Sequence, residues 1–75
     1  MEPNIDNILV FATNIKTESD KQKVSVALQE NTGILQWSID QEDIDCVLRI
    51  ESHSLAANQI IEIINNRQFS CTELE

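Results

Sequence analysis

The sequence predicts an α+β fold in which two β-α-β units share one antiparallel sheet. Two segments with helical periodicity each follow a strand-like run, and two alternating segments lie between the helices. A further alternating segment comes last in the sequence. The resulting order, β-α-β-β-α-β, is that of the ferredoxin-like sandwich, a four-stranded antiparallel sheet with two helices on one face.

The first strand and the first helix come from the segment between Ile8 and Gly33. Residues 8–13 (ILVFAT) are apolar and mostly branched or aromatic, which is typical of a central strand. Thr17 is the expected N-cap of the helix, and Asp20 completes a capping box with it. Gly33 is expected to end the helix in a left-handed conformation. Alternation turns Leu9, Phe11 and Thr13 toward the helices and leaves Ile8, Val10 and Ala12 on the other, open face.

Two half-buried strands form the middle of the chain. Residues 34–40 (ILQWSID) and 46–51 (CVLRIE) alternate apolar and polar side chains. The polar stretch 41–45 (QEDID) between them predicts a hairpin turn. The side chains predicted to face the helices are Leu35, Trp37 and Ile39 on the first of these strands and Cys46, Leu48 and Ile50 on the second.

A second helix is expected from Leu55 to about Arg67, with Ser54 as its N-cap. Residues 68–74 (QFSCTEL) then alternate as a fourth strand. The apolar stripes of the two helices are Val24, Ala27 and Leu28 on the first and Ala57, Ile60, Ile61 and Ile64 on the second.

These elements account for one domain. Seventy-five residues are close to the lower size limit for a self-sufficient core, so we expect a single domain over residues 1–75. Pro3 disfavours regular structure before the first strand, and residues 1–6 are expected to be a flexible tail. The spatial order of strands usual for this fold is 4-1-3-2.

The composition restricts the partners that the protein is expected to have. Thirteen acidic residues against five basic ones give a formal net charge of −8, which repels nucleic-acid phosphates and anionic lipid headgroups. No apolar run is long enough to span a bilayer, and the first residues, MEPNID, lack the features of a signal peptide. We therefore expect a cytoplasmic protein that binds neither nucleic acid nor membranes, with both cysteines reduced.

Residues 8–28, followed by Gly33-Ile34, resemble the heavy-metal-associated domain of copper chaperones and metal-transporting ATPases. That family carries a Met-x-Cys-x-x-Cys motif in the first loop. When Ala27-Leu28 and Gly33-Ile34 anchor the comparison, the methionine position falls at Ile15 and the two cysteine positions at Thr17 and Asp20. The resemblance therefore implies the fold without the family's thiolate ligands, and so without its soft-metal site.

The residues of the loop support the same interpretation. Cu(I) requires soft thiolate or thioether ligands, whereas Asn14, Thr17 and Asp20 offer hard oxygens and Lys16 adds a positive charge. Helix capping is the simpler role for these side chains, and we expect neither a metal nor a cofactor in the loop. Cys46 and Cys71 could act as displaced ligands, but their strands are separated by the first strand, about 10 Å at the usual strand spacing. Both are better explained as small core residues.

Two further groups of polar residues lie in other loops. Asp40, Glu42, Asp43 and Asp45 cluster at the hairpin turn, but they lack the spacing of a calcium loop. The cluster is either a solvated turn or a weak contact for a cation or a basic partner. His53 lies among polar chain neighbours without a recognisable catalytic set, so we do not expect an enzyme.

The open sheet face is the least ordinary feature. An apolar centre with a polar rim is the composition of an interface, although a few exposed aliphatic residues are also normal on any sheet. The leading hypothesis is a non-enzymatic module that binds a protein partner or a second copy through this face. The alternative is weak metal or cation handling by carboxylates or by the cysteines. The candidate interface residues are Ile8, Val10, Ala12, Val47 and Arg49, with Gln36, Ser38 and Glu51 around them.

Overall fold

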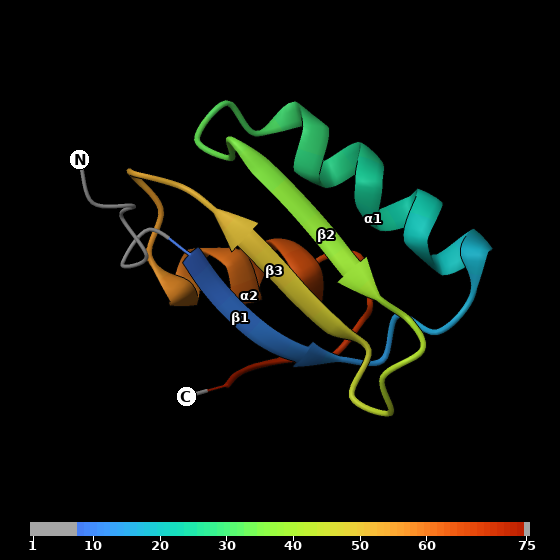
Figure 1. Ribbon diagram of the computed structural model, residues 1–75. Helices are drawn as coiled ribbons and strands as arrows, with labels where there is room; N and C mark the ends of the chain where they lie inside the picture. The colour runs from blue at the N-terminus through green and yellow to red at the C-terminus, as the bar shows by residue number, and fades with distance from the viewer. Residues whose placement is uncertain (1–7, 75) are drawn as a thin grey trace.

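Six elements follow one another in the predicted order β-α-β-β-α-β in the computed structural model, which describes residues 8–74 (Figure 1). The expected tail, residues 1–6, lies outside the described residues. The elements are β1 (Ile8–Thr13), α1 (Glu18–Glu30), β2 (Gln36–Asp40), β3 (Val47–Glu51), α2 (Ala57–Asn65) and β4 (Cys71–Glu73).

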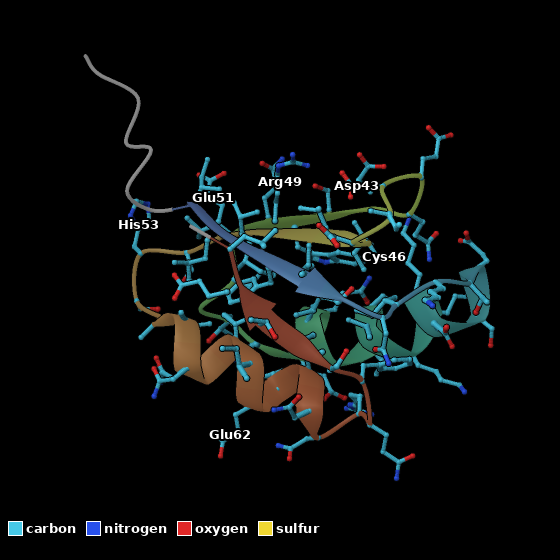
Figure 2. All side chains as sticks on the ribbon, turned by 90° about the horizontal axis from the view of Figure 1, so that it is seen from below. Asp43, Cys46, Arg49, Glu51, His53 and Glu62 are labelled. Atoms are coloured by element: carbon cyan, nitrogen blue, oxygen red, sulfur yellow. The ribbon has the colours of Figure 1, made fainter. Side chains whose placement is uncertain are left out.

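The four strands form one antiparallel sheet in the order β2-β3-β1-β4. This is the predicted order 4-1-3-2, read from the opposite edge. In Figure 1 α2 lies behind β1 and β3 while α1 runs along the β2 side, and in Figure 2 both helices lie below β2 and β3, so one face of the sheet is covered and the other is open. The α+β ferredoxin-like architecture predicted from the sequence is therefore confirmed.

The core fills the space between the sheet and the two helices. Phe11 of β1 is fully buried, and Thr13 is buried beside it, whereas Ile8 is 44% exposed on the other face. The predicted faces of β1 are thus correct, because side chains alternate across a strand. The fully buried large side chains are Phe11, Ile15, Val24, Leu28, Leu48, Ile50, Ile60 and Ile64.

Gly33 has a different role from the one predicted. Its φ is not positive, and α1 ends instead at Asn31 in an extended conformation. A Cβ atom on Gly33 would lie 2.9 Å from the Ser54 hydroxyl and 3.0 Å from Cγ of Leu55. A glycine is needed here because the loop after β3 packs directly against the backbone, which the sequence pattern does not reveal.

The chain after Gly33 also differs from the expectation. β2 begins at Gln36, not at residue 34, and Leu35 is 54% exposed rather than inward-facing. β3 begins at Val47, one residue later than predicted, because Cys46 has a positive φ of 44°. An L-residue in this left-handed region interrupts the extended conformation of a strand.

Ser54 is not the N-cap of α2. The helix begins after Ala56, whose backbone N–H donates to the Gln59 side chain over 2.8 Å. The buried hydroxyl nearby belongs to Ser52, which accepts hydrogen bonds from the backbone N–H groups of Ser54 and Leu55. These bonds hold the chain in a turn, so the helix cannot start at Leu55 as predicted.

The end of α2 explains why β4 is short. Gln68 has a φ of 71°, and the N–H of Phe69 donates to the carbonyl of Ile64 while that of Gln68 donates to Asn65. This pair of bonds is a Schellman motif with Gln68 in the left-handed position. The predicted strand 68–74 is therefore reduced to Cys71–Glu73.

Candidate functional site

The loop between β1 and α1 is organised by a capping box. The backbone N–H of Asp20 donates to the Thr17 hydroxyl over 3.0 Å. In return, one Asp20 carboxylate oxygen accepts from the backbone N–H groups of Thr17 and Lys16, each at 3.3 Å. The predicted capping box is confirmed, and the Thr17 hydroxyl and one Asp20 carboxylate oxygen are engaged by the start of the helix.

The ionisation of Asp20 follows from these contacts. Partial desolvation raises the pKa of the Asp20 carboxyl, but hydrogen bonds from Thr17 and from the Lys16 backbone outweigh it. The positive charge of Lys23 acts in the same direction, and the pKa lies below its ordinary value. Asp20 is therefore a carboxylate that stabilises the first turn of α1.

The rest of the loop is held by two side chains for which the sequence predicted no role in the loop. The Gln41 amide donates to the carbonyl of Thr17 over 2.8 Å and to that of Ile15 over 3.4 Å. The Thr13 hydroxyl accepts from the Ile15 N–H and donates to the Cys46 carbonyl over 2.7 Å. A hydroxyl at an inward-facing position such as Thr13 is a usable signal, because it needs a buried partner. Nothing in the sequence marks Gln41.

Ile15 lies where the resemblance placed the family's methionine, and it is fully buried in the core. The loop therefore has an apolar anchor on its inner side and backbone hydrogen bonds on its outer side. Hard oxygens engaged in helix capping do not provide a soft-metal site. Within residues 8–74, no group of three or more His, Cys, Asp or Glu side chains is placed to hold a metal ion.

No family model matches this sequence, and no curated protein does either. Solved structures do match. The first domain of the human copper chaperone for SOD1, in its copper(I)-loaded form, superposes with a TM-score of 0.77 at 17% identity, covering 88% of this chain and 89% of that one. The yeast copper transporter domain CCC2A superposes with a TM-score of 0.79 at 17% identity, covering 92% of this chain and 96% of that one. A copper-binding domain from HMA7, a P-type ATPase, superposes with a TM-score of 0.79 at 14% identity, covering 91% of this chain and 93% of that one.

The chain has the fold of a heavy-metal-associated domain. At these identities the likeness shows the fold alone, and it confirms the architecture that the resemblance implied. Where the resemblance places the two cysteines of that domain, this chain has Thr17 and Asp20. The N-terminal domain of ZntA in its Zn(II) form is also similar, with a TM-score of 0.75 at 12% identity, covering 91% of this chain and 92% of that one.

The two cysteines of this heavy-metal-associated fold do not form a pair. Both are free and buried; Cys71 lies in β4, opposite Thr13 of β1, and Cys46 precedes β3 on the other side of β1. Burial raises the pKa of the Cys71 thiol to about 11. Cys71 is therefore a protonated core residue at neutral pH, as the sequence analysis predicted for its packing.

The acidic hairpin turn is ordered by its own carboxylates. Asp40 accepts from the N–H of Glu42 over 3.1 Å, and Asp43 accepts from the N–H of Asp45 over 2.9 Å. All four acidic side chains are exposed, and Ile44 between them is 93% exposed. The turn is thus a charged, solvated surface with one protruding aliphatic side chain.

His53 is exposed in the loop between β3 and α2. The neighbouring Ser52 hydroxyl is buried and donates to the Gly33 carbonyl over 2.6 Å, so it already serves the loop structure. A nucleophile must be free to attack a substrate. The Ser52 hydroxyl is therefore committed to the structure of this loop.

The open face of the sheet carries most of the predicted interface residues. Arg49 and Glu51 extend from the sheet on the side opposite α2 (Figure 2). Ile8 is 44% exposed, and Val10 and Ala12 are half-buried. A hollow of about 320 Å³ lies on this face; five of the residues that line it are Ile8, Gln36, Ser38, Arg49 and Glu51.

Val47 does not contribute to this surface as expected. It is only 7% exposed, because β3 is a central strand and Val47 lies beside the hairpin turn, opposite Asp40 of β2. Leu74, just after β4, is 36% exposed, and its N–H donates to the Val10 carbonyl over 2.8 Å. The apolar part of the open face therefore follows β1 and the end of β4.

Neither helix within residues 8–74 has the length and apolar character needed to cross a lipid bilayer.

Proposed function

We propose that this protein is a non-enzymatic interaction module that has a heavy-metal-associated fold but does not use a soft metal. The observation that carries the proposal is the capping box: the Thr17 hydroxyl and one Asp20 carboxylate oxygen accept hydrogen bonds from backbone N–H groups, and both residues offer only hard oxygens. A cytoplasmic location is part of this proposal. The copper chaperone and transporter domains with this fold are described as binding copper. In this chain the loop between β1 and α1 instead caps the first helix.

The open sheet face is the proposed binding surface. It offers Ile8, Val10 and Leu74 with a polar rim and a hollow beside Ile8 and Arg49. Arginine and aliphatic side chains surrounded by polar groups are favourable at the centre of protein interfaces. Each strand keeps its fold-stabilising residues on the other face, so this surface can bind a partner without disturbing the core.

Metal titration tests the first half of the proposal. The reduced protein is titrated with Cu(I) against a competing chelator, and with Zn²⁺ and Ca²⁺ by calorimetry. We expect no stoichiometric submicromolar binding of any of the three. Cu(I) binding that persists after Cys46→Ser and Cys71→Ser would place a soft-metal site in the loop and contradict the proposal. Binding lost in those variants would favour the alternative of metal handling through the cysteines.

The second half is tested with a charge on the open face. Val10→Lys is expected to fold normally, because Val10 lies outside the core, and to lose most of the protein's partners in an affinity capture. Gln29→Lys, which adds the same charge at an exposed position of α1, is the matched control. If both variants capture the same proteins as the unmodified chain, the open face is not the binding surface.

A further inference from the structure

We propose that the open face pairs with the open face of a second copy of this chain, so that Arg49 of each copy meets Glu51 of the other. The inference rests on the proposed use of this face for binding and names the occupant. The observation behind it is the order of polar, charged and apolar side chains across the strands of the open face, which follows from the register of the sheet.

Two neighbouring rows of side chains cross the open face. In the first row, Gln36 of β2 is opposite Glu51 of β3, which is opposite Ile8 of β1. In the second row, Ser38, Arg49 and Val10 occupy the same three strands. Each row therefore runs from an uncharged polar residue through a charge to an aliphatic residue, and the two rows carry opposite charges.

This arrangement is complementary to itself. Consider a two-fold axis between the two open faces that runs perpendicular to the strands at the level of Ile50. This axis places each strand over the same strand of the second copy, with the two strands running in opposite directions. The first row of one copy then covers the second row of the other. Ile8 meets Val10, Gln36 meets Ser38, and Glu51 meets Arg49, each contact occurring twice as an isologous interface requires. Aligned packing of two sheets is a common arrangement.

The charges on this face favour a second copy. Arg49 makes no ion pair with the described residues; the salt bridge found among residues 8–74 joins Arg67 to Glu30 on the helical side. Arg49 is exposed, and an arginine without a partner can form a bidentate pair with a carboxylate across an interface. The charged side chains of the open face within residues 8–74 are Asp40, Arg49 and Glu51, so most of the carboxylates in this part of the chain stay away from the contact.

The hollow belongs to the same two rows. Ile8, Gln36, Ser38, Arg49 and Glu51 line it, and the long side chains of a second copy can enter it. The proposed contact consists of two rows of three side chains from each copy, so the dimer belongs to the weak class of interfaces.

A charge swap measured by sedimentation equilibrium tests the proposal. The protein is followed from about 10 μM to about 1 mM in moderate salt, and the unmodified chain is expected to dimerise. Arg49→Glu places carboxylates against each other, and Glu51→Arg does the same with guanidinium groups. Each is expected to weaken dimerisation at least tenfold. The double variant Arg49→Glu/Glu51→Arg restores both pairs and is expected to return to within about threefold of the unmodified chain.

Arg67→Glu is the control, because it reverses an arginine on the helical side and is expected to leave dimerisation unchanged. Circular dichroism and thermal unfolding verify that each variant is folded. A monomer at all concentrations overturns the inference, as does a dimer that the single reversals leave intact or that the double variant fails to restore. If the chain is monomeric but Val10→Lys still abolishes partner capture, the proposed function stands with a different protein on this face. If the chain is monomeric and Val10→Lys also leaves partner capture unchanged, the proposed function is overturned as well.

Discussion

The hydroxyl of Ser52 donates a hydrogen bond to the backbone carbonyl of Gly33 over 2.6 Å. The same hydroxyl accepts from the N–H groups of Ser54 and Leu55, so one buried side chain joins the turn after α1 to the loop before α2. Residues 19 positions apart in the sequence are thereby fixed to one another. The two β-α-β halves of the fold are connected here by a single oxygen atom.

Ser52→Ala is expected to lower the free energy of unfolding by about 1–3 kcal/mol, because a part-buried carbonyl and two N–H groups lose their partner. Urea denaturation measures the change. Ser54→Ala is the matched control, since Ser54 is exposed, and a loss within about 0.5 kcal/mol is expected for it. Equal losses in the two variants would contradict the role given to the Ser52 hydroxyl.

Gly33→Ala is expected to lower the free energy of unfolding by about 1–3 kcal/mol, because the new methyl group overlaps Leu55 and the Ser54 hydroxyl. The backbone of Gly33 is not left-handed, so steric crowding is the sole reason for the loss. In a Ser54→Ala/Leu55→Ala background the side-chain atoms nearest to the added methyl group are removed, and the same substitution should be less harmful. An unchanged loss in that background would show that crowding is not the cause.

Phe11→Ala is expected to cost about 3–5 kcal/mol, because Phe11 is fully buried among the core residues of both helices. That is most of the stability of a small domain. Ala12→Ser, on the half-buried opposite face, should cost far less. A denaturation midpoint that does not move for Phe11→Ala would mean that the faces of β1 have been assigned the wrong way round.

Asp20 makes the stability depend on pH in a defined direction. Its pKa is lower in the folded chain than in the unfolded chain, so its contribution is complete above the unfolded value of about 4 and disappears as the pH falls through the lower, folded value. Asp20→Asn should therefore be less stable than the unmodified chain at pH 7, with a difference that shrinks toward pH 3. Urea denaturation across this range measures it. A difference that does not vary with pH would assign the effect to packing.

Local patterns in the sequence were sufficient to predict much of the fold and of the loop. Alternation along β1 placed Phe11 and Ile8 on the correct faces, and the spacing of Thr17 and Asp20 gave the capping box, because both depend on residues close in sequence. The absence of the family's cysteines was likewise clear from the sequence, because aligning Ala27-Leu28 and Gly33-Ile34 with the heavy-metal-associated domain places Thr17 and Asp20 at the cysteine positions.

Most errors occurred where distant segments touch. Gly33 is explained by Ser54 and Leu55, which lie in another loop and which a local pattern does not reveal. The start of α2 is an exception, because Ser52 accepts from the N–H groups of Ser54 and Leu55, only two and three residues later. The burial of Val47 depends on its neighbours in the sheet, and the Gln41 contacts depend on how the hairpin folds toward the loop. On the open face, the alternation of β1 and β3 predicted that Ile8, Val10 and Arg49 lie there. The opposite charges of the two neighbouring rows could be recognised only from the register of the strands.

The three-residue length of β4 has a consequence for how the protein behaves in a crowded solution. An edge strand exposes unpaired N–H and C=O groups, and a long one can recruit strands from other molecules into growing aggregates. The Schellman motif at Gln68 shortens this edge to Cys71–Glu73, and the exposed side chains of Thr72 and Glu73 are polar and charged. The turn that ends α2 thus also protects this side of the sheet from fibril-like growth.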